Sequence, residues 1–466
     1  MTQTAASMEL WLKRLLGAAP DAPKMSLQQY LDGIPQLDHL ADLPRGTVVL
    51  VRGDVDAKPG PKPGDGDIRL RSMEQTLRYG RERGWVQVIF GHIGRDPKGS
   101  LGKVRARLAD ILGCEVGWIA DWLDPATTTI LDAAARTIKA AAPGSVIVLE
   151  NTRKYEIETA LWKTKPDGIP AVAPKLAKLA NEYAEKIGRV CVNEAFSAGS
   201  LDSSTTVVPA AMDRVALGQY VAGQFLGPLM DCLGAQLVVS SGLKIDKLDD
   251  LEAMINRGKI RWVFTAGSLA CGLKKAAAEL DGQQFGIGVA EDPAHSDKPY
   301  FIPRSRIEQA KKLIAEGREK GIEFVMPVDF VLQDGRVSET IGPADQQLDV
   351  GPATGALFEK KIGEFLAATK KTGEPAVAFH NGVLGMFEDP RFEAGTRRFV
   401  AQLKRMTDAG VKVYVGGGEG GKALEKYGQP DWVTHNFTAG GTVLNALGSE
   451  PVPYLVALWM AARGKR

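Results

Sequence analysis

The stretch TVVLVRGDVD, residues 47–56, contains the pattern that the rest of the chain repeats. Residues 47–51 are β-branched or apolar throughout, which predicts a strand buried on both faces, as in a parallel sheet. Glycine and charged residues follow at once over 52–56 and predict a turn beyond the strand's carboxyl end. The stretch therefore predicts a strand of a parallel sheet that ends in polar side chains.

The same strand-and-turn pattern recurs along the chain, with amphipathic spans between the strands. Further strands are expected at 86–90, 146–149, 190–192, 237–239, 262–264, 324–328, 376–379, 411–415 and 432–433. Helices are expected at 108–112, 173–187, 306–320 and 397–409. Such alternation indicates βαβ units, and roughly ten strands exceed one comfortable sheet. The sequence therefore predicts an α/β fold with two domains that divide near 210–235, with residues 215–233 as the connecting helix.

The composition excludes several classes of protein. Lys and Arg number 58 against 56 Asp and Glu, a net charge of +2, whereas a dedicated nucleic-acid binder usually carries a clear basic excess. Hydrophobic residues make up 44% of the chain, which excludes a disordered protein. The four cysteines form no CxxC pair, and no apolar run approaches the roughly 20 residues of a membrane span. Because no targeting signal is evident either, we predict a cytoplasmic protein with no nucleic-acid or membrane partner.

Glycine is in excess, at 52 of 466 residues, and five of the glycines lie in GGGEGG, residues 416–421. As GxGxxG this cluster resembles a dinucleotide fingerprint, but no acidic strand end follows about 20 residues later. As GxxxxGK it approaches a P-loop, but Ala423 stands where a magnesium-binding Ser or Thr is needed. Two further interpretations remain: an anion held by the amides of a helix N-terminus, or a purely structural turn.

Eleven segments at or near the strand ends occur in an order that resembles phosphoglycerate kinases over about residues 25–460. These segments are VVLVRGDVDA, GDIRL, VIFGHIGR, IVLENTR, VCVNEAF, SSGLKIDKL, FVMPVDFV, LDVGP, HNGVLGMFE, VGGGEGG and FTAGGT. The resemblance implies two Rossmann-like parallel-sheet domains joined by a hinge helix, with a cleft between them. It also implies that a small-molecule carboxylate binds the N-terminal domain and ATP or ADP with Mg²⁺ the C-terminal one. Domain closure would bring the two ligands together, and the chain would be a monomer.

On this resemblance we expect five segments along the chain. They are an N-terminal extension at 1–24, an acid-substrate-binding domain at 25–214, a connecting helix at 215–235, a nucleotide-binding domain at 236–445, and a C-terminal segment at 446–466 that packs back toward the N-terminal domain.

The resemblance also implies which residues form the site. The residues expected to act in catalysis are Arg69, Lys244, Gly418 and Gly441. Those expected to bind the acid substrate are Asp54, Asp56, Arg69, His92, Arg95 and Arg153. Those expected to bind the nucleotide are Lys244, Lys247, Gly267, Asn381, Gly385, Glu388, Gly416, Gly417, Gly418, Glu419 and Gly420.

The implied roles follow the chemistry of phosphoryl transfer, which needs positioning and charge neutralisation more than covalent help from the protein. Arg69 would contact the transferring group, because a planar guanidinium matches oxyanions bidentately, and Lys244 would contact a phosphate. Backbone amides near Gly418 and Gly440–Gly441 would form a paired anion cradle at helix starts. Glu388 would bind the ribose, and Glu419 is the candidate magnesium ligand.

The sequence departs from the family pattern at the acid-substrate side. After VNEAF the family carries a run similar to AHRAHAST, whereas this chain reads SAGSLDSSTT, with no basic side chain. The family's RVDFN becomes RGDVD, so Asp56 replaces an asparagine. Positive charge is therefore lost and a negative charge gained beside the expected phosphate ester. Phosphate recognition would then depend on Arg95 and Arg153, with His92 assisting.

The nucleotide side differs as well. GGGD[ST] becomes GGGEG, so Glu419 carries one more methylene than the family's aspartate and Gly420 lacks a hydroxyl. LKIDK is one residue shorter than AKVSDK, which affects the position of Lys247, and Val383 replaces a proline. Three hypotheses follow: a divergent phosphoglycerate kinase, a kinase or ligase of the same fold that activates another carboxylate as an acyl phosphate, and a non-catalytic nucleotide- or anion-binding protein.

Overall fold

The computed structural model describes residues 2–373, 375–448 and 451–463. The chain forms two compact units: unit 1, Met1–Leu226 with Pro451–Arg466, and unit 2, Gly227–Glu450. The chain passes from unit 1 to unit 2 within a π-helical turn, Phe225–Leu229. The expected terminal segments at 1–24 and 446–466 include residues 1, 449–450 and 464–466, which lie outside the described residues.

Unit 1 is built on a six-stranded parallel sheet in the order β3-β6-β2-β1-β7-β8. Its strands are β1 Val48–Gly53, β2 Val86–Phe90, β3 Val116–Ile119, β6 Val146–Leu149, β7 Val190–Glu194 and β8 Arg214–Leu217. A short antiparallel pair, β4 Leu123–Asp124 and β5 Thr129–Ile130, lies outside this sheet. Val49 and Val51 of β1 pack into one core with Leu77 and Leu108, whereas Leu50, between them, points to the opposite face.

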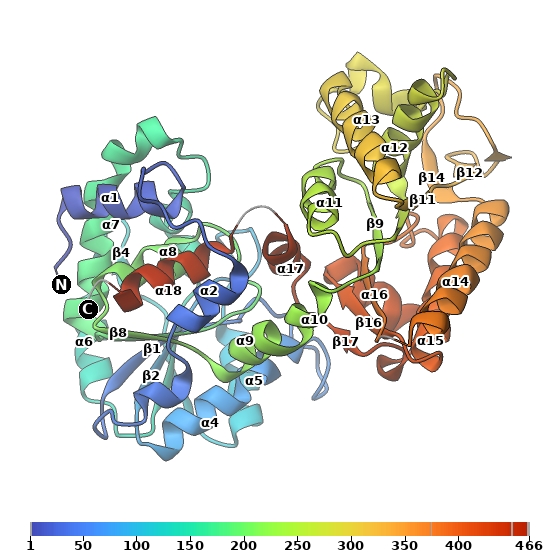
Figure 1. Cartoon of the computed structure of the whole chain (residues 1–466). Coiled ribbons are helices and arrows are strands. Elements are labelled where there is room, and N and C mark those ends of the chain that lie inside the picture. The colour runs from blue at the N-terminus through green and yellow to red at the C-terminus, as the bar shows by residue number, and fades with distance from the viewer. Residues whose placement is uncertain (1, 374, 449–450, 464–466) are drawn as a thin grey trace. The chain divides into compact units, whose positions relative to one another are not determined.

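Helices cover both faces of the unit 1 sheet, with α4 and α5 on one side and α7 and α18 on the other (Figure 1). The helices of unit 1 are α1 Ala5–Leu15, α2 Leu27–Gly33, α3 Ile68–Ser72, α4 Glu74–Glu82, α5 Gly102–Leu112, α6 Asp132–Lys139, α7 Ile169–Glu182, α8 Ser203–Thr206, α9 Gln219–Gln224 and α18 Pro453–Arg463. The N-terminal α1 packs on α7, where Trp11 Nε1 donates to the Thr206 carbonyl at 2.9 Å. The C-terminal α18 packs on α2 and α8.

Unit 2 repeats the architecture on a second six-stranded parallel sheet, in the order β11-β10-β9-β15-β16-β17. Its strands are β9 Leu237–Gly242, β10 Trp262–Ala266, β11 Glu323–Val325, β15 Val377–Asn381, β16 Lys412–Gly416 and β17 His435–Asn436. A small antiparallel sheet adds β12 Phe330–Leu332, β13 Val337–Ser338 and β14 Gln347–Val350. Two Rossmann-like parallel-sheet units confirm the predicted fold class.

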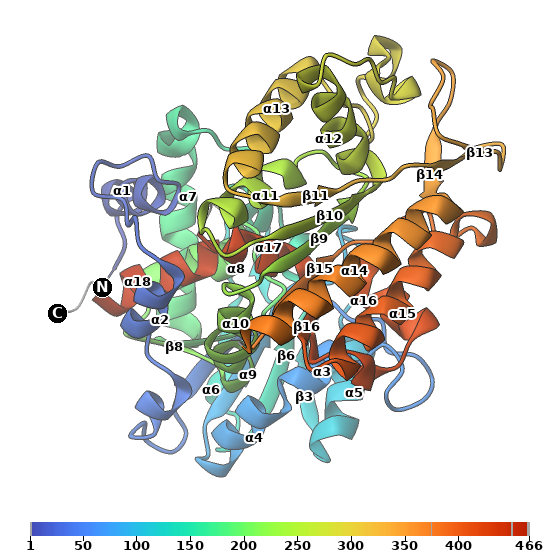
Figure 2. The ribbon, with the colours of Figure 1, turned by 45° about the vertical axis from the view of Figure 1, so that its right-hand side comes forward.

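The helices of unit 2 also lie on both faces of its sheet. They are α10 Met230–Cys232, α11 Lys247–Asn256, α12 Gly267–Leu280, α13 Arg304–Glu319, α14 Pro352–Thr372, α15 Ala394–Asp408, α16 Gly418–Tyr427 and α17 Gly440–Leu447. In Figure 2, α11, α12 and α13 lie on one side and α14, α15 and α16 on the other. The second group shares a core with the strands, in which Phe264 meets Phe358 at a ring-centroid distance of 5.4 Å.

The structure corrects two sequence expectations. Residues 215–217 do not belong to the connecting helix but to β8, which pairs with β7. Helix α9 begins only after Gly218, where the Glu194 side chain packs so closely that a Cβ would approach it to 2.1 Å. The strand expected at 432–433 is also wrong: Pro430–Trp432 forms a 3₁₀ turn that begins with proline, and His435–Asn436 pairs with β16 instead.

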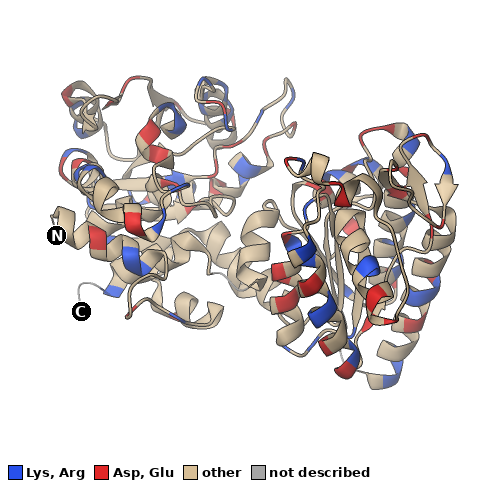
Figure 3. Ribbon diagram, turned by 90° about the horizontal axis from the view of Figure 1, so that it is seen from above, with Lys and Arg blue, Asp and Glu red and all other residues tan. Residues whose placement is uncertain are grey.

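Charged residues of both signs are interspersed on the helices of both units (Figure 3). In α13, for example, Arg304 pairs with Glu308 and Lys311 with Glu279 of α12. Among the described helices, none is long and apolar enough to cross a membrane. The four cysteines are free thiols, and three of them are buried.

Candidate active site

The carboxyl end of β1 holds the arginine that the sequence singles out for catalysis. Arg69, in α3, donates from NH1 to the Asp56 carbonyl at 2.9 Å and to Asp56 Oδ2 at 3.1 Å. Its Nε lies 3.8 Å from Oδ1 of Asp54, which is buried and accepts from the Ser197 hydroxyl at 2.6 Å. With 25% of its side chain exposed, Arg69 is fixed in direction by two aspartates yet remains accessible to a ligand.

Asp56 is held as an anion at this end of the sheet. Burial alone would raise the pKa of Asp56, but the backbone amide of Gly94 and the positive charge of Arg69 outweigh burial and lower it. The Gly94 amide donates to Asp56 Oδ1 at 2.8 Å. The residue that replaces the family's asparagine therefore carries a negative charge next to Arg69.

A second group of charged side chains, which we call the cation cluster, consists of Arg52, His92 and Arg153 around the carboxylate of Asp202. Asp202 is fully buried, and its oxygens lie 3.1 Å from His92 Nδ1, 3.2 Å from Arg153 NH2 and 3.8 Å from Arg52 NH2. Burial lowers the pKa of His92, although the Asp202 carboxylate opposes this. The two arginines are therefore the permanent charges that face Asp202.

Ser204 and Glu158 form a hydrogen-bonded chain with Arg52 of the cation cluster. Arg52 Nε donates to the Ser204 hydroxyl at 2.8 Å, which in turn donates to Glu158 Oε1 at 2.6 Å. Burial raises the pKa of Glu158 to about 7. Ligand atoms of His92, Glu158 and Asp202 lie within 4.8 Å of one another, but two guanidiniums beside them make the cluster suitable for an anion rather than a metal cation.

Three residues were expected to recognise a phosphate: His92, Arg95 and Arg153. The structure brings His92 and Arg153 together but leaves Arg95 apart. Arg95 is exposed on the loop after β2 and forms no ion pair with any described residue. Arg153 is held instead by the Gly94 carbonyl, which accepts from NH1 at 2.6 Å, and by the ring of Trp162, whose centroid lies 4.7 Å away.

In unit 2, the glycine cluster and the later AGG segment meet through their backbones. Gly417 has a φ of +101°, and a Cβ built on Gly440 would lie 2.4 Å from the Gly417 Cα. Gly417 precedes α16, and Gly440 opens α17, so two helix N-termini start side by side. Nothing described outside the neighbouring backbone lies within 4 Å of a Cβ on Gly418 or Gly441, and both residues, whose amides are expected to hold an anion, are exposed.

Strands β9 and β10 end in a second close approach of glycines. Gly242 and Gly267 form an isolated parallel bridge, and a Cβ on Gly267, where φ is +66°, would lie 2.5 Å from the Gly242 carbonyl oxygen. Gly267 is the first residue of α12, so a third helix N-terminus begins at the same edge of the sheet. Only glycine permits the two backbones to approach this closely.

The polar residues of unit 2 surround these glycines. Lys247 donates to Asn381 Oδ1 at 2.8 Å and to the Ser241 carbonyl, and Asn381 Nδ2 donates to the Gly416 carbonyl at 2.7 Å. Burial lowers the pKa of Lys247, although the charge of Glu419 counteracts this. Lys244 is exposed and makes no hydrogen bond with the described part of the chain. Gly420 is buried in the first turn of α16, behind the exposed Glu419.

The arrangement fits a magnesium nucleotide. A Cβ would fill the cradle between Gly417 and Gly440, and Lys244, Lys247 and Glu419 are the charged side chains that would suit phosphates and a divalent cation. Glu388 is exposed on the loop after β15, as a ribose ligand requires. Gly385, in the same loop, packs against the buried carboxylate of Asp349, whose Oδ1 would lie 2.3 Å from an added Cβ.

Asp349→Asn is expected to weaken the pH dependence of unfolding. Burial raises the pKa of Asp349 to about 7, so the folded chain keeps a proton that the unfolded chain loses near pH 4. Its contribution to stability is complete below about pH 4 and is lost as the pH rises through about 7, by at most about 1.4 kcal/mol per pH unit. Urea unfolding between about pH 5 and pH 7 measures this slope.

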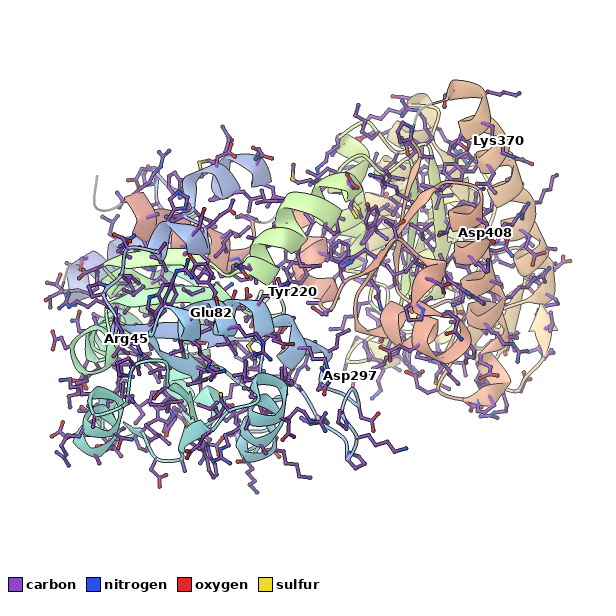
Figure 4. The ribbon with its side chains drawn as sticks, turned by 90° about the horizontal axis from the view of Figure 1, so that it is seen from below. Arg45, Glu82, Tyr220, Asp297, Lys370 and Asp408 are labelled. Atoms are coloured by element: carbon purple, nitrogen blue, oxygen red, sulfur yellow. The ribbon has the colours of Figure 1, made fainter. Side chains whose placement is uncertain are left out.

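The control is Asp408→Asn, which removes a carboxylate that is exposed at the end of α15 and paired with Lys404 (Figure 4). Asp349→Asn loses one acceptor for the Gly395 and Val350 amides, so its unfolding free energy is offset at every pH. An unchanged slope in Asp349→Asn would contradict the assignment.

Sequence reasoning missed two residues of the cation cluster. Arg52 stands in the quoted stretch RGDVD, and an arginine placed directly after an apolar strand was the signal available; the structure buries it. Asp202 stands in SAGSLDSSTT, a segment notable for its missing basic residues rather than for its one acidic residue. Its place among arginines depends on long-range contacts that the local sequence does not reveal.

Comparisons with known proteins identify the family of the chain. The family model described as phosphoglycerate kinase matches residues 40–450. The chain is 28% identical to the phosphoglycerate kinase of Clostridium beijerinckii over 426 residues, 89% of this chain and 96% of that protein. It is 30% identical to that of Solibacter usitatus over 414 residues, 84% of this chain and 90% of that protein. It is 29% identical to the cytosolic phosphoglycerate kinase of Triticum aestivum over 439 residues, 90% of this chain and 96% of that protein.

Solved structures support the same fold. The phosphoglycerate kinase of Coxiella burnetii superposes with a TM-score of 0.66 at 22% identity, covering 92% of this chain and all of that one. The enzyme of Pyrococcus horikoshii gives 0.70 at 22% identity, covering 93% of this chain and all of that one. The two alternative hypotheses gain no better support from these comparisons. The family match spans most of the chain, and the chain therefore belongs to the phosphoglycerate kinase family, phosphotransferases that use ATP or ADP with Mg²⁺ and a carboxyl group as the acceptor.

Proposed function

We propose that this chain transfers a phosphoryl group reversibly between ATP and the carboxylate of 3-phosphoglycerate, with the acid on unit 1 and the nucleotide on unit 2. The observation that carries the proposal is the backbone contact between Gly417 and Gly440, because it sets two helix N-termini beside each other, with the first-turn residues Gly418 and Gly441 exposed. Paired helix starts of this kind favour the phosphates of a nucleotide.

In the forward step, a carboxylate oxygen of the acid attacks the γ-phosphorus of ATP. The bond from that phosphorus to the bridging oxygen breaks, and ADP leaves with the electron pair. No proton has to move, so the chain contributes by positioning the two anions and by neutralising charge.

Arg69 is the residue of unit 1 that we assign to the transferring group. Its guanidinium is oriented by Asp54 and Asp56, and one quarter of its side chain is exposed. In unit 2, Lys244 and the amides at Gly418 and Gly441 would contact the phosphates, and Lys247 is held near them by Asn381. When bound, Mg²⁺ screens the negative charge of the nucleotide phosphates, and Glu419 is the carboxylate that would contact it.

The first test is formation of ADP from ATP, Mg²⁺ and 3-phosphoglycerate, measured with a coupled assay. Hydroxylamine, which traps acyl phosphates as hydroxamates, identifies the product as a carboxyl phosphate. We expect both signals to depend on the acid and to form about a hundredfold or more slowly in Arg69→Ala. A protein that binds ATP but forms neither product at saturating substrate would contradict the proposal.

We further propose a cytosolic monomer. The name of the Triticum aestivum relative, which includes the word cytosolic, supports the location. Light scattering on the purified chain is expected to give a mass near 50.0 kDa, and a mass of twice this value would contradict the monomer.

A further inference from the structure

We propose that Asp202 is a specificity-determining residue that occupies the cation cluster as a resident anion and competes there with the ester phosphate of the acid substrate. The proposal rests on the proposed function, because it concerns the acid that unit 1 binds. A chain with Asp202 would bind the ester phosphate more weakly than a chain that has the same arginines but a neutral residue at position 202.

The contacts of Asp202 are those that a bound oxyanion would make. Arg153 NH2 lies 3.3 Å from Oδ1 and 3.2 Å from Oδ2, and Trp162 Nε1 donates to Oδ1 at 2.9 Å. Asp202 precedes α8, where aspartate usually caps the helix through its side chain, but here the side chain makes no such bond. The carboxylate is turned to the cations instead.

The cation cluster has capacity for a further anion. Arg153 is nine-tenths buried, and its Nε has no hydrogen-bond partner among the described residues, although almost every buried donor in a folded protein has one. The adjoining Trp162 is 42% exposed, so the cluster reaches solvent on that side. A ligand that approached past Trp162 could accept a hydrogen bond from Nε of Arg153.

The charges explain the competition. Arg52 and Arg153 carry two positive charges, and Asp202 cancels one of them. An ester phosphate carries nearly two negative charges near neutral pH, so it matches the two arginines only when Asp202 is absent or displaced. Because both anions draw on the charge of the same Arg153 guanidinium and repel each other, the ester phosphate binds more weakly in the presence of Asp202 than it would in its absence.

Asp202→Asn tests this competition, because asparagine keeps an oxygen for the Trp162 bond and removes the charge. We expect the KM and the Kd for 3-phosphoglycerate, and the Kd for inorganic phosphate, to fall about tenfold or more. We expect kcat to change less than about threefold and the Kd for ATP to stay constant, because the chemistry uses Arg69 and unit 2.

The control is Asp42→Asn, which removes an exposed carboxylate of unit 1 from its partner Arg214, 2.7 Å away. It changes net charge equally and should leave the Kd for 3-phosphoglycerate unchanged. Calorimetry measures each Kd, and the fluorescence of Trp162, isolated by comparison with Trp162→Phe, reports binding at the cation cluster itself.

Two outcomes would overturn the proposal: an unchanged or higher Kd for 3-phosphoglycerate in a folded Asp202→Asn, or an equal fall in Asp42→Asn. If Asp202→Asn unfolds too readily for calorimetry, its melting temperature should rise more with added inorganic phosphate than that of the wild type, and an equal rise would overturn it.

Binding needs no turnover, so a lower Kd without acyl phosphate in any variant would contradict the proposed function and leave the role of Asp202 supported. Turnover in the wild type with no change of KM in Asp202→Asn would support the proposed function and contradict the role of Asp202.

Discussion

Replacing Arg69 with alanine is expected to lower kcat by about a hundredfold or more while the Kd for ATP changes less than about threefold. The guanidinium lies at the carboxyl end of β1 in unit 1, oriented by Asp54 and Asp56, whereas we propose that the nucleotide binds to unit 2. Because its donors match an oxyanion bidentately, the loss should fall on the transition state, in which charge spreads over the transferring oxygens. Steady-state kinetics and calorimetry with ATP separate the two quantities.

Two variants make this result specific. Arg71→Ala removes an arginine from the same helix, α3, where it pairs with Asp67 at 2.9 Å, and should leave kcat nearly unchanged. Arg69→Lys keeps the charge but loses the planar fork, so it should recover only part of the activity. A parallel loss of kcat and of ATP affinity in Arg69→Ala would mean that the arginine maintains the fold rather than the reaction.

Much of the fold could be predicted because most of the long buried strands are apolar runs that can be recognised from the local sequence. β2 and β6 have the expected bounds, since a short apolar run between polar turns determines both ends of a buried parallel strand. β3 was missed because VGWI contains a glycine and lies at the sheet edge with half-exposed residues. The first residues of the connecting helix were wrong because VAL at 215–217 suits a helix or a strand equally, and only pairing with β7 decides.

The site could be predicted in part and for the same reason. Residues that directly follow strands, such as Asp54 in unit 1 and Gly417 in unit 2, lie where the parallel topology brings the strand ends to one edge of their own sheet. Arg95 also follows a strand, yet its loop turns it to solvent, which strand position alone does not determine. Asp202 lies in an irregular segment, so only the folded chain reveals that its carboxylate neutralises the arginines.

Asp56 and Asp202, which depart from the family pattern in unit 1, both reduce the local positive charge. Asp56 lies against Arg69, and Asp202 lies against Arg52 and Arg153, so each places a carboxylate on a cation that an acid substrate would use. The near-neutral charge of the whole chain thus has a local counterpart in unit 1, where these carboxylates neutralise neighbouring arginines. Unit 2 retains its close glycine contacts. We therefore expect ATP binding there to be more sensitive to a change of backbone shape than to a change of charge.

Gly440→Ala is expected to raise the Kd for ATP about thirtyfold, which corresponds to about 2 kcal/mol. The added Cβ would lie 2.4 Å from the Gly417 Cα and 3.1 Å from the Gly417 nitrogen, and neither backbone atom can move aside as a flexible side chain does. The starts of α16 and α17 would have to separate, which misdirects the amides that face the phosphates. Calorimetry with ATP and Mg²⁺ measures the loss, and unfolding in urea should show a destabilisation of about 1–3 kcal/mol.

The matched control is Gly363→Ala, the same substitution in α14 of the same unit. Its Cβ would lie 3.1 Å from the terminal NH2 of Arg405, which is the far end of a flexible side chain, and alanine favours a helix by up to about 1 kcal/mol. We therefore expect an unchanged Kd for ATP and equal or greater stability. Because Gly440→Ala leaves every phosphate-contacting side chain in place, a normal Kd in that variant would show that the lysines, rather than the paired helix starts, hold the nucleotide.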